Sequence, residues 1–393
     1  MYHNNLSQAY RAAGNLMQAE KSAKRTIKLD ANIPEAYVNL GAIALEKNEF
    51  NSAITAYKKA VNLRENYIDA LLGLGDSLVK SEKVDAGLKK YEEILAQQPD
   101  NVAAITRTGI ALRKLNRVDE AIKHYKKHIS RLPEEPDFYN NLSLLYQQKG
   151  NIAEAVICLR KLLEITPNDN VSRHLLNSFE GLKTITAPAE YVSDLFDNYA
   201  HSFESHLVNK LDYHVPELLA KEILGHTVKK NDLLFLDLGC GTGLMGVMLK
   251  NFCAYLSGVD FAPKMIEQTR IKGIYQELVV GDVLEFMNNK QDASYDVIAA
   301  ADVFIYVGEL KSVFSEAKRL LSSGGVFAFS IEDAADESSD YVLNDTGRYS
   351  HTKKYIHELQ LKHDFIERAC SSIQIRNENG KPVNGYLYVL SVV

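Results

Sequence analysis

A glycine-rich segment that follows an apolar run carries the clearest chemical signal in this sequence of 393 residues. Residues 236–246 read LDLGCGTGLMG and include Gly239, Gly241 and Gly243. Glycines at this spacing let the backbone turn tightly and approach a ligand closely. Asp260 ends the next apolar run about 20 residues further on, where a carboxylate can accept hydrogen bonds from both hydroxyls of a ribose. These residues predict a site for a ligand that contains a nucleoside.

The charges around this segment distinguish between two such ligands. Gly241 begins a match to the G-x-G-x-x-G pattern of dinucleotide sites. However, Asp237 lies two residues before Gly239, and its carboxylate would repel a pyrophosphate. S-Adenosylmethionine has no phosphate, and its ammonium and sulfonium groups suit a carboxylate. Asp282, after the third apolar run, could accept a hydrogen bond from the adenine amino group. We therefore predict S-adenosylmethionine as the cofactor, whereas helix capping by Asp237 alone would leave the other acids unexplained.

Short apolar runs that alternate with helical segments would position these residues. The runs are LLFLDLG, YLSGVDF, ELVVGDV, YDVIAAADVFIYV and GGVFAFSIE. Such alternation predicts a parallel sheet with helices on both faces, and ligands bind such sheets at the carboxyl ends of the strands. The last runs, FIERACSSIQIR and GYLYVLSVV, flank NENGKPVN and predict a hairpin, so the C-terminal strand would be antiparallel. We predict this α/β domain over residues 190–393.

The motifs DLGCGTG, VDFAPKM, VVGDV and AADVFIYVGEL, in this order, resemble those of class I S-adenosylmethionine-dependent methyltransferases, which have a Rossmann-like fold. The stretches YVSDLFDNYAHSFESHLVNKLDYHVPELL and TGRYSH narrow the resemblance to predicted methyltransferases with N-terminal tetratricopeptide repeats. The resemblance implies that the methionine part of the cofactor is held by Asp237, Gly239, Cys240, Gly241 and Gly243. It also implies that Asp260 holds the ribose, that Phe261 and Met265 flank the adenine, and that Asp282 and Val283 contact its polar edge. Asp302 in AADV would lie near the transferring methyl group.

Methyl transfer from a sulfonium requires mainly that a nucleophile is aligned with the methyl–sulfur axis. A base is needed only when the acceptor is a hydroxyl or a protonated amine. We predict Tyr199, Asp302 and His351 as the catalytic candidates, and further candidates are His201, His206, Tyr306 and Tyr349. The tyrosines could instead be packing residues and the histidines surface residues. The sequence thus indicates the reaction better than it indicates the base.

The first half of the chain repeats itself every 34 residues, as the segments 34–65, 68–99, 102–133 and 136–167 align without insertion. Small residues recur at the eighth and twentieth positions, bulky ones at the fourth, seventh and twenty-fourth, and a proline ends three of the four segments. This pattern allows two helices to approach closely and then breaks the second one. It resembles the tetratricopeptide repeat. A preceding segment fits the same register, so we predict an all-α solenoid of about five repeats plus a closing helix over residues 1–182.

Such solenoids bind partners in a concave groove, and Asn5, Asn39 and Asn141 occupy a position that faces this groove in the family. Asparagine amides can bind the backbone of an extended peptide, so a peptide or protein is the predicted partner, although a solvated surface is the plain alternative. Met1 falls almost at the start of the first helix. Because terminal repeats normally carry a polar cap, we expect the native protein to extend further upstream.

Composition excludes several classes of protein. No apolar stretch is long enough for a membrane helix, and the first ten residues contain no secretion signal. The four cysteines form no CxxC pair, so we predict a cytoplasmic protein with reduced thiols and no metal site. A net charge of −6 disfavours nucleic acid as a partner.

Three functions fit these observations. The first is a methyltransferase whose repeats recruit a peptide or protein acceptor. The second is a small-molecule methyltransferase whose repeats serve only assembly. The third is a scaffold whose methyltransferase fold binds the cofactor as a sensor or is inert, although the intact set of Asp237, Asp260 and Asp282 argues against it. The first is the one we predict.

Overall fold

The computed structural model describes residues 2–197, 200, 203–204, 213–228, 231–336, 338–378 and 380–393. The chain divides into two compact units, Met1–Asn168 and Asp169–Val393. The predicted boundary at residue 182 stays a prediction. The helix that was expected to close the repeat array, α11 (Asn170–Phe179), belongs to the second compact unit.

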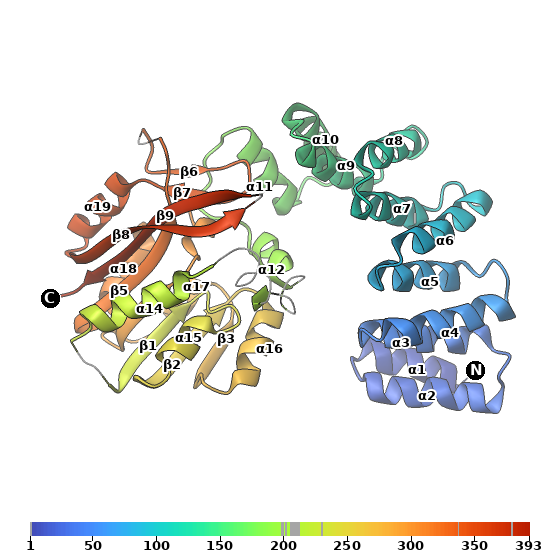
Figure 1. Cartoon of the computed structure of the whole chain (residues 1–393), viewed down its shortest axis with the longest axis horizontal. Coiled ribbons are helices and arrows are strands. Elements are labelled where there is room, and N and C mark those ends of the chain that lie inside the picture. The colour runs from blue at the N-terminus through green and yellow to red at the C-terminus, as the bar shows by residue number, and fades with distance from the viewer. Residues whose placement is uncertain are drawn as a thin grey trace. The chain divides into compact units, whose positions relative to one another are not determined.

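The first unit consists of successive helix pairs, which Figure 1 shows in blue to green. The pairs are α1 (Tyr2–Ala12) with α2 (Leu16–Leu29), α3 (Pro34–Glu46) with α4 (Phe50–Leu63), α5 (Ile68–Lys80) with α6 (Val84–Gln97), α7 (Val102–Lys114) with α8 (Val118–Ile129), and α9 (Pro136–Gln148) with α10 (Ile152–Ile165). The first helix of each pair is followed by a residue with a left-handed backbone. These residues are Gly14, Asn48, Glu82, Asn116 and Gly150. Their spacing reproduces the 34-residue period of the sequence in the backbone itself.

The small residue at the eighth position of a repeat makes room for the tyrosine at the twenty-fourth. A Cβ atom added to Gly75 would lie 2.4 Å from the ring of Tyr91, and one added to Gly109 would lie 2.2 Å from the ring of Tyr125. Both tyrosine side chains are almost completely buried. The 34-residue period of the sequence therefore reflects a repeated contact, in which a tyrosine ring of the second helix of a pair packs on a glycine of the first.

Replacement of Gly109 by alanine is expected to destabilise the repeat unit by about 1–3 kcal/mol, because the added methyl group overlaps the Tyr125 ring in a packed interior. Denaturant unfolding of the full chain, followed by the helical circular dichroism signal, measures this loss. Gly225→Ala is the matched control, since Gly225 lies in a helix and a methyl group added to it would have no other atom within 4 Å. A Gly109→Ala variant as stable as the parent would contradict the packing described.

The second unit is built around a seven-stranded sheet of order β3-β2-β1-β4-β5-β9-β8. Its strands are β1 (Leu233–Leu238), β2 (Cys253–Asp260), β3 (Glu277–Val280), β4 (Tyr295–Ala300), β5 (Leu321–Glu332), β8 (Ile366–Glu378) and β9 (Lys381–Ser391). The first five run parallel, and β9 is antiparallel to both β5 and β8. A separate two-stranded sheet joins β6 (Tyr341–Leu343) to β7 (Tyr349–His351). The predicted mostly parallel sheet with an antiparallel C-terminal strand is confirmed.

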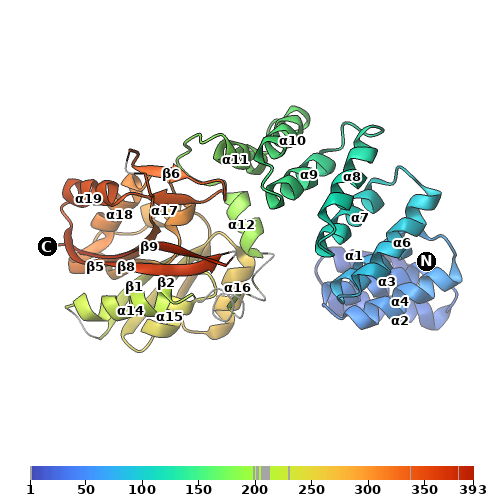
Figure 2. The ribbon, with the colours of Figure 1, turned by 45° about the horizontal axis from the view of Figure 1, so that its top comes forward.

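Helices cover both faces of this sheet (Figure 2). The helices are α12 (Ala189–Asp197), α14 (Val215–His226), α15 (Leu244–Leu249), α16 (Pro263–Lys272), α17 (Val283–Asn288), α18 (Lys311–Leu320) and α19 (Lys353–Lys362), together with the short 3₁₀ helix η1 (Phe304–Tyr306). Neighbouring residues of a strand alternate between two apolar clusters: Phe235 packs toward α14 and α15, whereas Leu236 packs toward α17, α18 and α19. Helices cover both faces of the central strands, and ligands bind such sheets at the carboxyl ends of the strands. In the described residues, no helix has the length and apolar character to cross a membrane.

Candidate cofactor and acceptor site

A cavity of about 760 Å³ lies at the carboxyl ends of β1, β2 and β4. The cofactor candidates on its wall, among the described residues, are Gly239, Gly241, Asp260, Phe261, Asp282 and Val283. The wall also includes Asp302, Tyr306, Arg348, Arg376 and Glu378. These residues come from strands, loops and helices that are far apart in the sequence, so folding alone brings them together.

The glycine loop between β1 and α15 has a left-handed backbone at all three predicted glycines, with φ of 60° at Gly239, 51° at Gly241 and 84° at Gly243. Side chains at Gly239 and Gly243 would come within 2.6 Å and 2.9 Å of neighbouring side chains. A Cβ atom on Gly241 would instead meet only Phe203 among the described residues, at 3.8 Å. Gly241 therefore faces the open cavity and allows a ligand to approach the backbone.

Asp260 joins the glycine loop to the end of β2. One carboxylate oxygen accepts a hydrogen bond from the Gly241 N–H and the other from the Ala262 N–H, both at 2.8 Å. Burial raises the pKa of Asp260, and the two backbone hydrogen bonds oppose that shift. Each oxygen keeps a second lone pair for a ligand hydroxyl. The side chain is thus fixed in direction before any ligand binds.

The next strand ends in a similar way. Asp282 caps the N-terminus of α17 by accepting from the Glu285 N–H at 2.8 Å, and it lies on the cavity wall together with Val283 and Phe261. The helix cap uses one carboxylate oxygen, so the other can accept from a ligand amino group. Met265, which the resemblance placed beside the adenine, is buried in an apolar cluster and does not line the cavity.

Asp237, at the end of β1, and Cys240, within the glycine loop, have buried side chains and do not line the cavity. The Tyr275 hydroxyl donates to Asp237 at 2.5 Å and accepts from the Gly246 N–H at 3.1 Å, which ties the loop to the helix that follows it. Burial raises the pKa of Asp237 to about 7, although the hydrogen bond from Tyr275 lowers it. The buried Asp237 carboxylate thus supports the glycine loop through Tyr275.

The raised pKa of Asp237 predicts how stability depends on pH. Between the unfolded value of 3.8 and the folded value of about 7, the folded chain keeps a proton that the unfolded chain loses, so stability falls as pH rises through this window. Asp237→Asn removes this titration, and the introduced amide can still accept from Tyr275. We expect the ligand-free variant to gain stability over the parent at pH 8 and to lose that gain toward pH 5. Thermal unfolding at both pH values measures it, and an equal difference at both would contradict the assignment.

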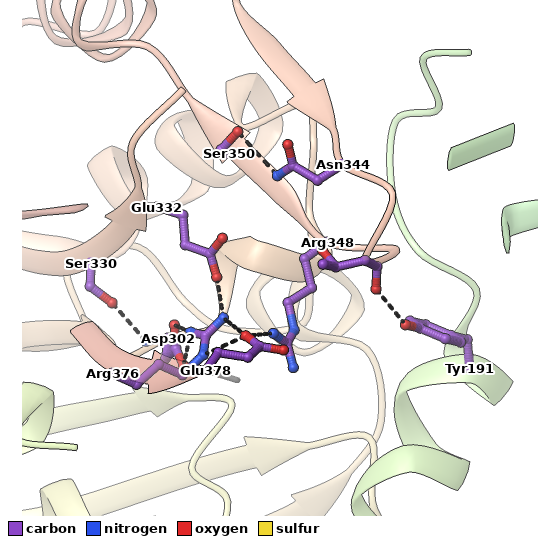
Figure 3. A network of polar contacts seen from close by, with 10 residues as sticks. Tyr191, Asp302, Ser330, Glu332, Asn344, Arg348, Ser350, Arg376 and Glu378 are labelled. Carbon is purple, nitrogen blue, oxygen red and sulfur yellow. Dashed lines mark hydrogen bonds and ion pairs between the residues drawn. The ribbon is translucent and has the colours of Figure 1, made fainter. Parts of the chain in front are cut away.

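Asp302 follows β4 with a left-handed φ of 60°, and its N–H donates to the Ser330 hydroxyl at 2.8 Å. Its carboxylate accepts from Arg376 at 3.2 Å and 3.3 Å (Figure 3). Arg376 also pairs with Glu332 and, at 3.3 Å, with Glu378. The Arg376 side chain is only 4% exposed, so three carboxylates from three elements share one buried guanidinium. Of the three main catalytic candidates, Asp302 is the one that the described residues place on the cavity wall.

Two arginines on the cavity wall, Arg348 and Arg376, were not singled out in the sequence. Arg348 donates to Glu378 at 2.5 Å and forms a hydrogen bond with the Tyr306 hydroxyl. Burial alone would raise the pKa of Glu378, but the guanidinium groups of Arg348 and Arg376 together lower it. The signal that could have identified Arg376 was its position at the end of the strand run FIERACSSIQIR, where apolar side chains are expected to face inward. Arg348 stood in the quoted TGRYSH, without any signal of its own.

The other predicted catalytic residues have different outcomes. His351 is fully buried, and its Nε2 lies 3.0 Å from the carbonyl oxygens of Val307 and Gly308. Burial lowers the pKa of His351 to about 4, so the neutral ring donates to these carbonyls. This geometry argues against the catalytic role predicted for His351, because the ring positions a loop and does not line the cavity. Tyr199 lies outside the described residues, as do His201 and His206, so these roles stay predictions.

The segment expected to be a simple junction between the domains forms part of the cavity wall. The Ile185 carbonyl accepts from the N–H groups of Gly308 and Glu309, at 2.9 Å and 3.0 Å, and the Ala187 N–H donates to the Tyr306 carbonyl at 2.9 Å. Ile185 and Ala187 line the cavity, as do Val192, Leu195 and Phe196 of the adjoining segment and α12. The chain before the α/β fold thus supplies the apolar side of the site.

Helix α11 anchors the hairpin that carries Arg348. His174 is buried, and its Nε2 lies 2.9 Å from the carbonyl oxygen of Gly347. A side chain at Gly347 would lie 2.7 Å from the Tyr191 hydroxyl, so this glycine permits close packing of the hairpin against α12. The buried Tyr349 hydroxyl bonds to Thr184 and is not on the cavity wall. These contacts fix the hairpin backbone on both sides of Arg348.

The chain matches known families in both of its halves. Residues 236–329 match the family described as "Methyltransferase domain". Residues 107–169 match "YpiA-like, C-terminal tetratricopeptide repeats", residues 72–136 match "Tetratricopeptide repeat", and residues 43–81 match "TPR repeat".

Curated relatives are similar to part of the chain. A ubiquinone biosynthesis O-methyltransferase of Pasteurella multocida is 22% identical over 191 residues, which are 44% of this chain and 77% of that enzyme. The corresponding enzyme of Xylella fastidiosa is 25% identical over 142 residues, or 35% of this chain and 54% of that enzyme.

Solved structures are also similar to part of the chain. MamA (residues 41 to the end) of Desulfovibrio magneticus is 22% identical and covers 43% of this chain and 96% of that one, with a TM-score of 0.39. YrrB, titled "a TPR protein with an unusual peptide-binding site", is 22% identical and covers 44% and 89%, with a TM-score of 0.37. From its own helix pairs, its sheet and the family matches, this chain carries tetratricopeptide repeats followed by a methyltransferase domain.

Proposed function

We propose that the chain transfers a methyl group from S-adenosylmethionine to an acceptor bound in the same cavity. The observation that carries this proposal is the cavity wall itself, where Gly241 leaves open space beside the oriented carboxylate of Asp260. A ribose would be held by Asp260, and the adenine edge by Asp282. The donor supplies an activated methyl carbon when bound. The remaining task of the protein is to orient the acceptor. Asp302 follows β4, the neighbour of β1 in the sheet, and lines the cavity, so we assign this role to it.

We further propose that the repeats recruit a peptide or protein, in line with the common use of such arrays. The three asparagines predicted to face the groove give this proposal only partial support. Asn39 is buried and its amide donates to the Asn4 side chain at 2.8 Å, while the Asn141 amide donates to the Asp137 carbonyl at 2.8 Å. Asn39 and Asn141 are thus already engaged within the repeats, whereas Asn5 is exposed, so we expect recruitment to use other groove residues as well. Reduced thiols at all four cysteines fit the cytoplasm, which is our proposed compartment.

A second candidate is methylation of a small molecule, with the repeats serving only assembly. The apolar wall from Ile185, Val192, Leu195 and Phe196 favours it, because such a wall can enclose a small acceptor. The curated relatives are named as O-methyltransferases of ubiquinone biosynthesis, which is also consistent with a small acceptor.

Calorimetric titration of S-adenosylmethionine into the full chain tests the proposed function, with NAD as the control ligand. We expect the methyl donor to bind with a dissociation constant on the order of micromolar, about −8 kcal/mol, and NAD not to bind. Binding of neither ligand would favour an inert scaffold over a methyltransferase. Tighter binding of NAD would overturn the cofactor assignment.

Recruitment by the repeats is tested with a chain that begins at residue 169. This chain keeps α11, whose His174 supports the Arg348 hairpin, whereas a chain that begins at residue 183 would lose that contact. If the repeats recruit the acceptor, the shortened chain should bind the donor normally and show a raised Michaelis constant for the acceptor. An unchanged Michaelis constant would favour the small-molecule function.

A further inference from the structure

The cavity wall has more negative than positive side chains. Among the described residues that line it, five are acidic, namely Asp260, Asp282, Asp302, Glu309 and Glu378, and two are basic, namely Arg348 and Arg376. Glu309 is paired with Lys311 at 3.1 Å, but even without it the single positive net charge of S-adenosylmethionine leaves negative charge in excess on the wall. An anionic acceptor would meet that excess in a site partly shielded from water, where charge repulsion is strong.

Two of the acids on the cavity wall, Asp302 and Glu378, are held in fixed directions. Asp302 is held by its left-handed backbone, by Ser330 and by Arg376. Within the described residues, every hydrogen bond of Glu378 goes to its Oε2, which accepts from Arg348 and Arg376. The second oxygen, Oε1, is therefore available to accept from a ligand. Two carboxylates oriented in this way can each accept one N–H from an acceptor nitrogen.

Aromatic rings line the same cavity. They belong to Phe196, Phe203, Tyr213, Phe261 and Tyr306. Phe196 packs edge-to-face on Tyr306, with ring centroids 5.6 Å apart, and on Phe203, with centroids 5.9 Å apart. Aromatic rings combined with carboxylates favour cations, and they recognise alkylammonium groups through the negative faces of the rings. The wall thus points independently, by charge and by ring chemistry, to a cationic ligand.

We propose that the methyl acceptor is an alkylamine, either the side chain of a lysine or a free small amine, whose nitrogen is oriented by Asp302 and Glu378. This inference rests on the proposed function, since it names the acceptor of that same site. The guanidinium groups of Arg348 and Arg376 lower the pKa of Glu378, which makes it a weak base, and Arg376 occupies the Asp302 carboxylate, so neither acid is suited to removing the proton of a hydroxyl during transfer. An amine requires less of the protein, because it can lose its proton to water before the transfer.

The transfer is balanced as follows. The acceptor binds as an ammonium ion, and the bound sulfonium beside it favours loss of one proton to water. The nitrogen lone pair then forms a bond to the methyl carbon while the carbon–sulfur bond breaks, and that electron pair remains on sulfur. The product is an N-methylammonium ion and a neutral thioether. The positive charge has moved from sulfur to nitrogen, where Asp302 and Glu378 can stabilise it.

The test uses the full chain, labelled methyl donor and three probes that share one apolar body: phenylethylamine, phenylethanol and phenylacetate. A peptide with a single lysine, and the same peptide with norleucine, form a second arm. We expect the amine or the lysine peptide to be methylated at least about tenfold faster than the matched alcohol, acid or norleucine peptide, a difference of about 1.4 kcal/mol in transition-state free energy. The arm that is preferred identifies the source of the amine.

Variants and binding make the result decisive. Glu378→Gln should lower kcat/KM for the amine about tenfold while donor binding is unchanged, whereas Glu358→Gln, an exposed acid of α19, should change neither. Preference for the alcohol or the acid would overturn the inference. So would a failure of phenylethylamine and the lysine peptide to bind the protein saturated with S-adenosylhomocysteine. Failure of the donor itself to bind would instead reject the proposed function.

Discussion

Replacement of Arg376 by methionine is expected to lower the free energy of unfolding of the second unit by about 3–5 kcal/mol, because it leaves buried carboxylates without a counter-ion. Asp302, Glu332 and Glu378 all pair with this one guanidinium, and the exposed fractions of their side chains are 15%, 11% and 32%. Burial already raises the pKa of Glu332, although Arg376 opposes that shift. Without Arg376, Asp302 and Glu332 must take up protons or reach water, whereas Glu378 keeps its pair with Arg348. Denaturant unfolding at pH 7 measures the loss.

Two matched variants separate charge from shape in this prediction. Arg376→Lys keeps the positive charge but lacks the planar fork that reaches three partners, so an intermediate loss is expected. Arg319→Met removes a guanidinium that pairs with Glu316 and Asp292. The Arg319 side chain is 29% exposed, so this change should lower the free energy of unfolding much less. The loss in Arg376→Met should also shrink as pH falls and the carboxylates become protonated. A loss below about 1 kcal/mol at pH 7 would mean that the cluster is solvated.

Replacement of Asp260 by alanine is expected to weaken binding of S-adenosylmethionine more than about tenfold, or about 1.4 kcal/mol. The change removes the carboxylate proposed to hold the ribose. It also leaves the N–H groups of Gly241 and Ala262 without their acceptor, so the glycine loop loses the contact that sets its direction. Both effects act on the same ligand. Calorimetric titration of the parent and the variant measures the difference.

An exposed acid close in sequence provides the control. Glu267 lies on α16, which follows β2, and its side chain is exposed, so Glu267→Ala should bind the donor like the parent. Melting temperatures of both variants show whether the unit remains folded under the conditions of titration. Equal affinities for Asp260→Ala and the parent would remove Asp260 from the cofactor site, although the fold would be unaffected by that result.

Features set by neighbours in the sequence could be predicted. The repeat period reflects contacts such as Gly109 with Tyr125, only sixteen residues apart, and the glycine loop follows directly from its own backbone requirements. Asp260 and Asp282 could be predicted as site residues because each ends or follows a parallel strand, and such ends meet at one edge. Local spacing and the rule for parallel sheets were sufficient for these features.

Which way a side chain faces required the tertiary structure. His351 could line the cavity or turn away from it, and packing turns it toward the carbonyls of Val307 and Gly308. Asp237 likewise faces Tyr275 beneath the loop, not the cavity. Neither outcome is encoded in the spacing of the residue, because both depend on partners that are distant in sequence.

The sequence by itself determined the two kinds of domain, the 34-residue repeat, the order of the parallel strands' motifs and the acids at their ends. Only the tertiary structure decided that Asp302, Arg376 and Glu378 form one cluster on the cavity wall. Arg376 reaches Asp302 across 74 residues, and an irregular register of β8 between Gln374 and Arg376 leaves both Ile375 and Arg376 buried. A register shift of this kind re-aims a side chain without any local signal, because it arises from pairing with another strand.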